Sequence, residues 1–240
     1  MAKTLSVIIP VYNEEKTIYT VLERITQVKL IQGVGLEIIV VNDCSTDQTQ
    51  LQIERFTTLP SHLSLQCFTH PTNMGKGSAI HTGIQHASGD FIIIQDADLE
   101  YDPNEFNLLL KPILADYADV VYGSRFIGGQ PHRILFFWHS FGNKLLTFLS
   151  NALTNLNLTD METCYKLFRA EIIQSLHLKE KRFGFEPEVT AKISRLNNVR
   201  IYEVGISYYG RSYVDGKKIG IQDGFRAIWC ILKYNLWSRK

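Results

Sequence analysis

The alternation of two sequence patterns in the first half of the chain constrains the fold more than any other feature. Short apolar runs rich in β-branched residues alternate with segments whose apolar residues recur at helical spacing. The runs that predict strands are Leu5–Pro10, Glu37–Val41, Leu65–Thr69, Phe91–Gln95 and Asp119–Tyr122. Helices are predicted over Glu14–Val28, over Thr46–Phe56 with a cap from Ser45 or Thr46, over Gly77–Ala87, and from Pro103 onward. Continuously apolar strands separated by helices are typical of an α/β fold with a parallel sheet covered on both faces.

Polar clusters follow four of these predicted strands at the point where each strand ends. They are Pro10–Glu14, Asn42–Asp47, Asn73–Gly77 and Asp96–Glu100. In an open parallel sheet the ligand binds beyond the carboxyl ends of the strands, and these ends share one edge. The sequence therefore predicts that the four clusters line one binding site.

Length and composition are typical of one folded domain with a net charge close to zero. The 240 residues predict a single domain, with the regular pattern over about 1–125 and an irregular, helical and aromatic part over about 126–240. Lys and Arg number 25 against 24 Asp and Glu, so no overall basic charge favours a nucleic-acid partner. The four cysteines are scattered without a C-x-x-C pair, which predicts reduced packing residues in a cytosolic protein.

No segment has the pattern of a membrane span or a secretion signal. A transmembrane helix needs about 18 or more uncharged apolar residues, and no run of that length occurs. The apolar run near the N-terminus, Val7–Pro10, is too short for a signal peptide and is predicted to be a strand. We therefore expect a cytoplasmic protein that is soluble or peripheral to a membrane.

Two carboxylates, Asp96 and Asp98, follow the most apolar predicted strand. At the strand period of two, both side chains point the same way. Paired carboxylates repel each other unless a cation lies between them, and oxygen ligands favour Mg²⁺ or Mn²⁺. Glu100 could join or orient this group. The alternative is a solvated turn leading into Pro103.

The other strand-end clusters offer groups that suit a nucleotide. Asp43 could accept a hydrogen bond from a base or a ribose, Glu14 could bind ribose hydroxyls, and Tyr12 could stack on a base. Glu14 and Tyr12 could instead be a helix-start acid and a packed ring. Gly75 and Lys76 resemble a phosphate-binding loop. Their spacing matches neither a P-loop NTPase nor a dinucleotide-binding motif.

Taken in order, these motifs resemble those of family-2 glycosyltransferases with the GT-A fold, a Rossmann-like, mostly parallel sheet flanked by helices. Within that family the chain is most similar to the dolichyl-phosphate mannose synthase and polyprenyl-phosphate sugar synthase group. The matching segments, which extend from Leu5 to about Arg211, are Val7–Glu14, Val40–Asp47, Asn73–Gly77, Gln95–Pro103, Gly123–Phe126 and Thr159–Lys166.

The resemblance implies a role for each matching position. The donor would be a nucleoside-diphosphate sugar, GDP-mannose or a UDP-sugar, and its site would be lined by Pro10, Tyr12, Glu14, Asp43, Gly75, Lys76, Asp96, Ala97 and Asp98. A divalent cofactor, Mn²⁺ or Mg²⁺, would bind Asp96, Asp98 and Glu100. The catalytic set would be Arg125 at a donor or acceptor phosphate, Asp160 near the sugar, and Arg211 at the diphosphate. Residues 126–240 would bind a polyprenyl or dolichyl phosphate.

Two positions depart from the pattern of the group. Cys164–Lys166 stands where the group usually has Gly-Phe-[Lys/Arg]. Members often carry an arginine before Ser140, where this chain has Phe136 or Phe137. The nearest basic substitutes are His132 and Arg133. Contacts to the acceptor are therefore less well predicted than contacts to the donor.

The implied reaction is a direct displacement that inverts the anomeric carbon. Lys76, Arg125 and Arg211 would stabilise the leaving diphosphate together with the metal ion. A lipid phosphate, with a second pKa of about 6, would need little help from a base. If the acceptor is a hydroxyl of a saccharide or protein instead, Asp160 is the predicted base. A nucleotidyltransferase and a non-catalytic nucleotide-sugar-binding protein are the remaining alternatives.

The C-terminal part contains a predicted mobile loop and a basic amphipathic helix. The glycine-bounded stretch Gly210–Lys218 is predicted to close over the diphosphate. An apolar stripe at helical spacing follows, made of Phe225, Ile228, Trp229, Leu232 and Leu236. Residues 215–240 carry six basic and two acidic side chains. This pattern predicts peripheral membrane contact, and the alternative is packing on the domain or in an oligomer.

Overall fold

The fold is built on one seven-stranded sheet in the part of the chain that the structure describes. The structure is a computed structural model, and it describes residues 3–56, 63–129, 131, 133–134, 137–211 and 221–237. The strand order is β3-β2-β1-β4-β6-β5-β7. The strands are β1 (Thr4–Val11), β2 (Gly35–Asn42), β3 (Ser64–Thr69), β4 (Phe91–Ile94), β5 (Val120–Ser124), β6 (Lys166–Arg169) and β7 (Ile201–Gly205).

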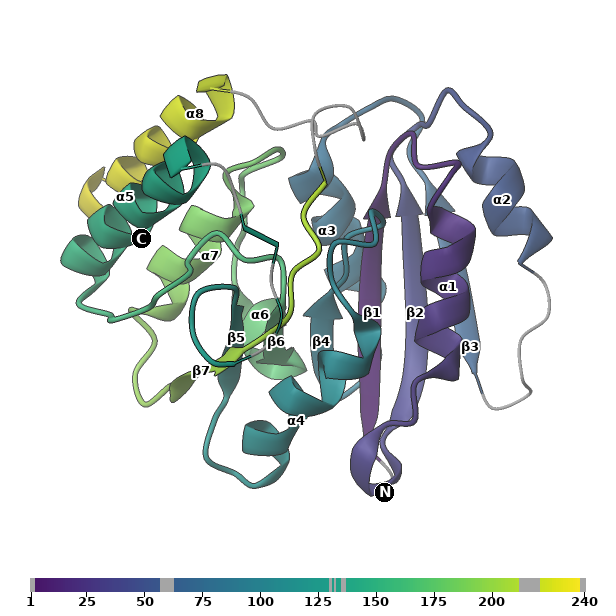
Figure 1. The fold of residues 1–240 in the computed structure, drawn as a ribbon, viewed down its shortest axis with the longest axis horizontal. Coiled ribbons are helices and arrows are strands. Elements are labelled where there is room, and N and C mark those ends of the chain that lie inside the picture. Colours follow the sequence, from purple (N-terminus) through teal and green to yellow (C-terminus); the bar gives the residue numbers. More distant parts are fainter. Residues whose placement is uncertain are drawn as a thin grey trace.

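Helices lie on both faces of this sheet (Figure 1). They are α1 (Ile18–Gln27), α2 (Thr49–Arg55), α3 (Lys76–His86), α4 (Phe106–Leu114), α5 (Phe137–Thr154), α6 (Ala170–Ser175), α7 (Phe185–Ile193) and α8 (Ile221–Leu232). Three short turns of other helix types add η1 (Ile31–Gly33), η2 (Pro103–Glu105) and the π-helical η3 (Lys233–Trp237). The predicted α/β class with a mostly parallel sheet is confirmed.

The centre of the sheet forms as its apolar runs predict. Strand β1 pairs in parallel with β2 on one side and with β4 on the other. All residues of β4 are buried, as are seven of the eight residues in both β1 and β2. Strands covered by helices on both faces bury nearly every side chain, which explains why they are apolar rather than alternating.

Two strands beyond the predicted series, which ends with Asp119–Tyr122, were missed. Strand β6 inserts between β4 and β5 and runs antiparallel to both, and β7 adds a parallel edge beside β5. Strand β6 has only four residues, beginning at the buried Lys166. So short a run, which starts with a charged residue, carries too little apolar pattern to be recognised.

The predicted cap of the second helix is wrong, because α2 begins at Thr49 and its N-cap, Gln48, makes no side-chain hydrogen bond. The Ser45 hydroxyl instead accepts a hydrogen bond from the backbone N–H of Asn13 at 3.0 Å. The Thr46 N–H donates to the Asn13 side chain at 2.8 Å. These contacts join the loops that follow β1 and β2, so the polar residues stabilise the sheet edge rather than a helix end.

The helices of the C-terminal half gather at the β5–β7 end of the molecule. Helices α5 and α8 lie side by side there, and α7 packs beneath them (Figure 1). Among the described residues, no helix is long and apolar enough to cross a membrane. The four cysteines are free thiols, as predicted, and the thiols of Cys164 and Cys230 are buried.

Candidate active site

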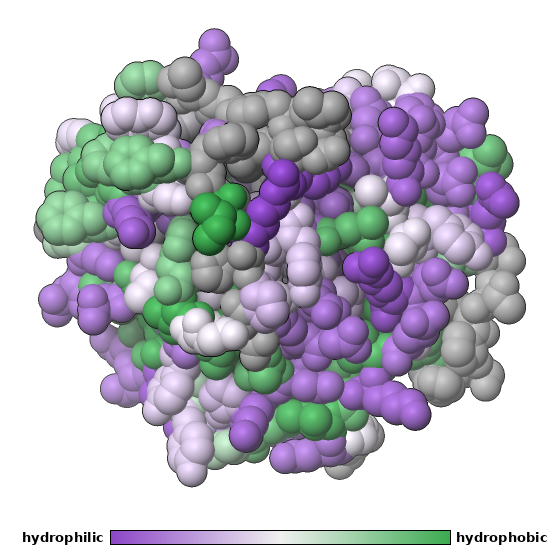
Figure 2. Space-filling model, viewed as in Figure 1, coloured by the Kyte–Doolittle hydropathy of each residue, from purple (hydrophilic) through white to green (hydrophobic). Residues whose placement is uncertain are grey.

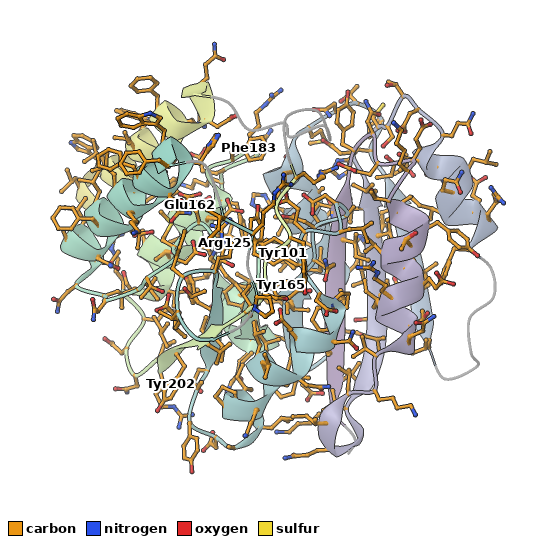
Figure 3. All side chains as sticks on the ribbon, viewed as in Figure 1. Tyr101, Arg125, Glu162, Tyr165, Phe183 and Tyr202 are labelled. Atoms are coloured by element: carbon orange, nitrogen blue, oxygen red, sulfur yellow. The ribbon has the colours of Figure 1, made fainter. Side chains whose placement is uncertain are left out.

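A cavity of about 950 Å³ opens at the carboxyl ends of β1, β2 and β4. All four predicted strand-end clusters contribute to its wall, so the prediction that they meet is confirmed. The predicted residues that line it are Pro10, Tyr12, Glu14, Asp43, Gly75, Lys76, Asp96, Ala97, Asp98, Glu100, Arg125 and Arg211. The opposite wall comes from α5, α7 and α8 (Figure 3 labels Arg125, Glu162 and Phe183 between the two walls).

The carboxylates Asp96 and Asp98 do not lie on a strand. Strand β4 ends at Ile94, and the chain turns through Leu99, whose φ is 62°. Spacing along a strand therefore cannot explain why these side chains are close. The turn still holds these carboxylates close enough to repel each other. Burial, Asp96 and Glu100 together raise the pKa of Asp98 to about 7.

Cationic side chains compensate this acidic group. The Lys76 ammonium lies 2.7 Å from Asp96 Oδ1 and 3.8 Å from Glu186 Oε1. Burial disfavours the charge of Lys76, but Asp96 and Glu186 outweigh it and raise the pKa of the lysine well above its usual value. The Arg211 guanidinium lies 3.2 Å from Asp98 Oδ2. Both cations thus contact the predicted metal ligands.

Glu100 accepts two hydrogen bonds beside this group, and its contact with a metal ion stays a prediction. Its Oε2 accepts a hydrogen bond from the Tyr208 hydroxyl at 2.7 Å, and its Oε1 accepts one from the Arg211 N–H at 2.6 Å. No group of three or more His, Cys, Asp or Glu within the described ranges has the arrangement of a metal site. Asp96 and Asp98 alone suit Mg²⁺ or Mn²⁺, which bind through one or two carboxylates plus substrate phosphates and water.

The Asp43 carboxylate holds the glycine loop in place. Its oxygens accept hydrogen bonds from the backbone N–H groups of Met74 at 2.8 Å and Gly75 at 2.7 Å, and His70 Nδ1 lies 2.7 Å away. Gly75 has a φ of 96°, and a Cβ there would lie 2.5 Å from the carbonyl oxygen of Lys181. Asp43 lines the cavity, but its oxygens already have three protein partners. Its contact with a base or ribose stays a prediction.

Asp160, the predicted base if the acceptor is a hydroxyl, is paired with Arg125 in the structure. Asp160 is fully buried and does not line the cavity. Its carboxylate accepts hydrogen bonds from Arg125 Nε at 2.7 Å, Nη2 at 2.8 Å and the backbone N–H at 3.1 Å. Through this ion pair Asp160 positions Arg125, which does line the cavity. A role of Asp160 as a base stays a prediction.

Arg211 connects the end of β1 to the turn after β4. Its guanidinium contacts Glu14 at 3.2 Å as well as Asp98. Of the predicted loop Gly210–Lys218, only the first two residues fall within the described ranges. Arg133, the predicted basic substitute, donates from Nη1 to the Gly210 carbonyl at 2.7 Å, so it supports the residue before Arg211. His132 and Phe136 lie outside the described residues.

Glu162 and Glu186 are cavity residues that the sequence reasoning missed. Glu186 lies in the first turn of α7, near Lys76. Glu162 comes two residues after Asp160, and its Oε1 is enclosed without a hydrogen-bond partner among the described residues. Burial and the nearby Glu186 raise the pKa of Glu162 to about 8. The only sequence signal for Glu162 is its position within the motif Thr159–Lys166, two residues after Asp160.

The sequence matches the family described as "Glycosyl transferase family 2" over residues 6–176, which is more than half of the chain. The chain belongs to this family. It is a glycosyltransferase, and the predicted resemblance is confirmed. The cavity at the sheet edge is therefore its candidate active site.

Similar characterised proteins act on lipid phosphates, according to their names. A dodecaprenyl-phosphate galacturonate synthase of Rhizobium johnstonii is 26% identical over 98% of this chain and 67% of its own length. A dolichol-phosphate mannosyltransferase of Pyrococcus furiosus is 28% identical over 90% of this chain, and the match spans 60% of that protein. A dolichyl-phosphate β-glucosyltransferase of Trichomonas vaginalis is 27% identical over 98% of this chain and 74% of its own length.

Solved structures of another protein have a fold similar to that of this chain. Glucosyl-3-phosphoglycerate synthase of Mycobacterium tuberculosis, in complex with Mn²⁺, UDP and glucosyl-3-phosphoglycerate, superposes with a TM-score of 0.72. The match has 20% identity and covers 97% of this chain and 80% of that protein. The same enzyme has been solved with Mg²⁺ and UDP at a TM-score of 0.70. The glycosyltransferase described here thus has the GT-A fold.

Proposed function

We propose that this glycosyltransferase moves a hexose from a nucleoside-diphosphate sugar to a polyprenyl phosphate, with inversion at the anomeric carbon. The observation that carries the proposal is the composition of one cavity. Its sheet wall has the polar side chains that a nucleoside diphosphate needs, and its helical wall has apolar residues such as Trp138, Leu145 and Phe225. The names of the relatives support a lipid-phosphate acceptor.

The sheet wall is the donor side of this proposal. Tyr12 lines the cavity and is 37% exposed, which leaves ring surface on which a base can stack. A divalent cation held by Asp96 and Asp98 would supply positive charge to the diphosphate leaving group. Lys76 and Arg211 compensate those carboxylates in the structure. They are placed to compensate the phosphates of a bound donor.

The acceptor side of the proposal requires no general base. Arg125 lines the cavity between the two walls, and Asp160 accepts hydrogen bonds from its Nε and Nη2 but not from Nη1. That nitrogen remains for the acceptor phosphate, which is already anionic near neutral pH because its second pKa is about 6. The buried, fully paired state of Asp160 is consistent with an acceptor that carries its own negative charge.

Asp98→Asn tests the donor half of the proposal. We expect GDP or UDP to raise the melting temperature of the wild type in the presence of Mn²⁺, because a ligand that binds only the folded state stabilises it. Asp98→Asn should lose this shift and lower transfer from a labelled GDP-mannose or UDP-glucose to polyprenyl phosphate by more than about 100-fold. Asp116→Asn, an exposed change away from the cavity, is the matched control. Full transfer by Asp98→Asn in excess chelator would refute the metal site.

The helical wall continues outward into an exposed aromatic face, which we propose contacts the membrane that holds the acceptor. It consists of Phe137, Trp138, Phe141 and Phe148 of α5 together with Phe225, Trp229 and Trp237 of α8 and η3, each at least half exposed. Trp229 and Trp237 stack with their ring centroids 5.9 Å apart. Figure 2 shows apolar surface gathered over α5 and α8, on the left of the view.

The sequence left two alternatives for the C-terminal helix, contact with a membrane or packing on the domain, and α8 has features that suit each. Ala227, Cys230 and Ile231 are buried, so one side of α8 packs on the domain. Phe225 and Trp229 point to the opposite, exposed side. The exposed side chain of Lys144 adds positive charge, and α5 contains no acidic residue. An aromatic face with a basic neighbour suits the surface of an anionic bilayer.

Liposome flotation of a double variant, Trp138→Glu with Trp229→Glu, tests the membrane proposal. The wild type should float with phosphatidylserine-containing vesicles at low salt, and the double variant should stay in the soluble fraction. Tyr117→Glu removes an equally exposed aromatic ring far from this face and should float like the wild type. If the double variant floats as well, or if the wild type stays soluble as a dimer that the double variant disrupts, the face does not bind membrane.

A further inference from the structure

The cavity contains an acidic side chain to which the proposed donor and metal sites give no role. Glu162 lies between Asp160 and β6 and lines the cavity beside Arg125. Its Oε1 is enclosed by protein and has no hydrogen-bond partner among the described residues. A buried polar oxygen without a partner costs free energy, so its presence in a folded protein calls for an explanation, and a catalytic or binding role is one.

The charged groups around Glu162 do not neutralise it by direct contact. Glu186 of α7 and Asp160 are negative, Lys166 of β6 and Arg125 are positive, and His139 of α5 lines the same cavity. The Lys166 ammonium donates to the carbonyl oxygen of Thr163 and lies 5.1 Å from the Tyr122 ring centroid. Arg125 is engaged by Asp160.

The neutral carboxylic acid is therefore the favoured form of Glu162 near neutral pH. Its pKa of about 8 results from burial first and from Glu186 second. A neutral carboxyl group has an O–H donor as well as an acceptor oxygen. A carboxylate at this place would repel an anion bound at Arg125, whereas the neutral acid can donate a hydrogen bond to it.

We propose that Glu162, as a neutral acid, donates a hydrogen bond to the phosphate of the acceptor while Arg125 supplies the positive charge. This inference rests on the proposed function, because it specifies how the acceptor phosphate is recognised. A phosphate bound beside Glu162 disfavours ionisation of the carboxyl group, so the bound complex keeps the proton in place. The pair then selects an acceptor that is anionic at its reacting end.

The experiment measures transfer to farnesyl phosphate, a short soluble acceptor, from about pH 7 to about pH 10, a range that brackets the relevant ionisation. The wild-type acceptor KM should be constant below about pH 8 and rise about tenfold per pH unit above it. Glu162→Gln keeps a donor N–H at every pH, so its acceptor KM should stay within about threefold of the wild type at pH 7 and lack the alkaline rise. Glu162→Ala should raise the acceptor KM about tenfold, since it loses the hydrogen bond.

Mn²⁺-dependent binding of GDP or UDP by each variant shows that its fold and donor site are intact. If Glu162→Gln loses turnover while its acceptor KM is unchanged, Glu162 is a proton acceptor and the inference is wrong. If all variants keep the wild-type acceptor KM and pH profile, Glu162 does not contact the acceptor, and the proposed function still stands. A wild type that binds nucleotide but transfers nothing to prenyl phosphates refutes the proposed acceptor, and this inference with it.

Discussion

Two glycines at the start of α3, Gly75 at its N-cap and Gly77 in its first turn, permit a close backbone approach that no other residue allows. Gly75 has a positive φ, and the Gly77 Cα faces the chain at Glu180 and Lys181 so closely that a Cβ would collide with the Glu180 carbonyl oxygen. The backbone N–H of Ser78 donates to the Lys181 carbonyl at 3.0 Å. The segment before α7 thereby holds the loop that presents Lys76 to the cavity.

Gly77→Ala is expected to lower the free energy of unfolding by about 2 kcal/mol, because the added methyl group forces two backbone segments apart. It should also weaken nucleotide binding, since the loop carries Lys76. Urea unfolding and nucleotide titration measure the two effects. Gly142→Ala in α5, where an added Cβ meets no atom within 4 Å, should instead raise stability by about 0.5–1 kcal/mol. A stable Gly77→Ala protein would contradict the close approach.

At the scale of the elements, one buried acid attaches α8 and η3 to the rest of the domain. The Glu180 carboxylate accepts hydrogen bonds from Arg226 Nη2 at 2.5 Å, Lys233 Nζ at 2.9 Å and the Tyr234 hydroxyl at 2.7 Å. Burial alone would raise the pKa of Glu180, but these hydrogen bonds outweigh it and lower the pKa to about 2. The same residue lies against Gly77, so α8 and the Lys76 loop share a support.

Glu180→Gln should lower the free energy of unfolding by about 2 kcal/mol at neutral pH, because it removes the charge that three donors share. The folded pKa lies below the ordinary value of 4.5. The stabilisation is therefore complete above that value and is lost as the pH falls toward about 2. Melting curves of both proteins should differ by a constant amount from about pH 7 to about pH 5 and converge below it.

Glu23→Gln on the exposed side of α1 is the control for this change and should leave the melting temperature within about 1 °C of the wild type. A difference between Glu180→Gln and the wild type that persists undiminished at about pH 2.5 would show that the carboxylate charge is not the cause.

At the scale of the whole molecule, Arg211 joins distant parts of the chain across the active site. The segment after β7 runs back over the sheet toward α3 and β1 (Figure 1). Arg211 at its end contacts Glu14 and Asp98, and its N–H donates to Glu100. The C-terminal part thus completes a cavity whose proposed donor side lies in the N-terminal half.

Arg211→Ala is expected to lower transfer about 100-fold and nucleotide affinity less than about tenfold, because charge on the leaving diphosphate increases in the transition state. Single-turnover kinetics and nucleotide titration give the two values. Arg200→Ala, which removes an arginine paired with Asp116 and Asp119 away from the cavity, should change neither by more than about twofold. Equal losses in transfer and nucleotide affinity would show that Arg211 stabilises the bound ground state and the transition state equally.

The sequence by itself determined the central sheet, the edge on which the site lies and the family. Strands β1, β2 and β4 and helices α1 and α3 could be predicted because burial on both faces leaves a local apolar pattern in each segment. The cavity residues of the first half could be predicted because the topology of a parallel sheet places all strand ends at one edge. The last strands could not, because β6 is short and finds its partners far along the chain.

Only the tertiary structure decided which polar side chains are paired with other protein groups and which line the cavity. Asp160 and Arg125 are separated by 35 residues, and Asp43 and Gly75 by 32. The residue types of Asp160 and Glu162 are nearly the same, yet one is paired inside the protein, and the other lines the cavity with no partner for Oε1 in the described part of the chain. A carboxylate has the same chemistry in both places. Its role depends on donors brought close by folding, and no local pattern records them.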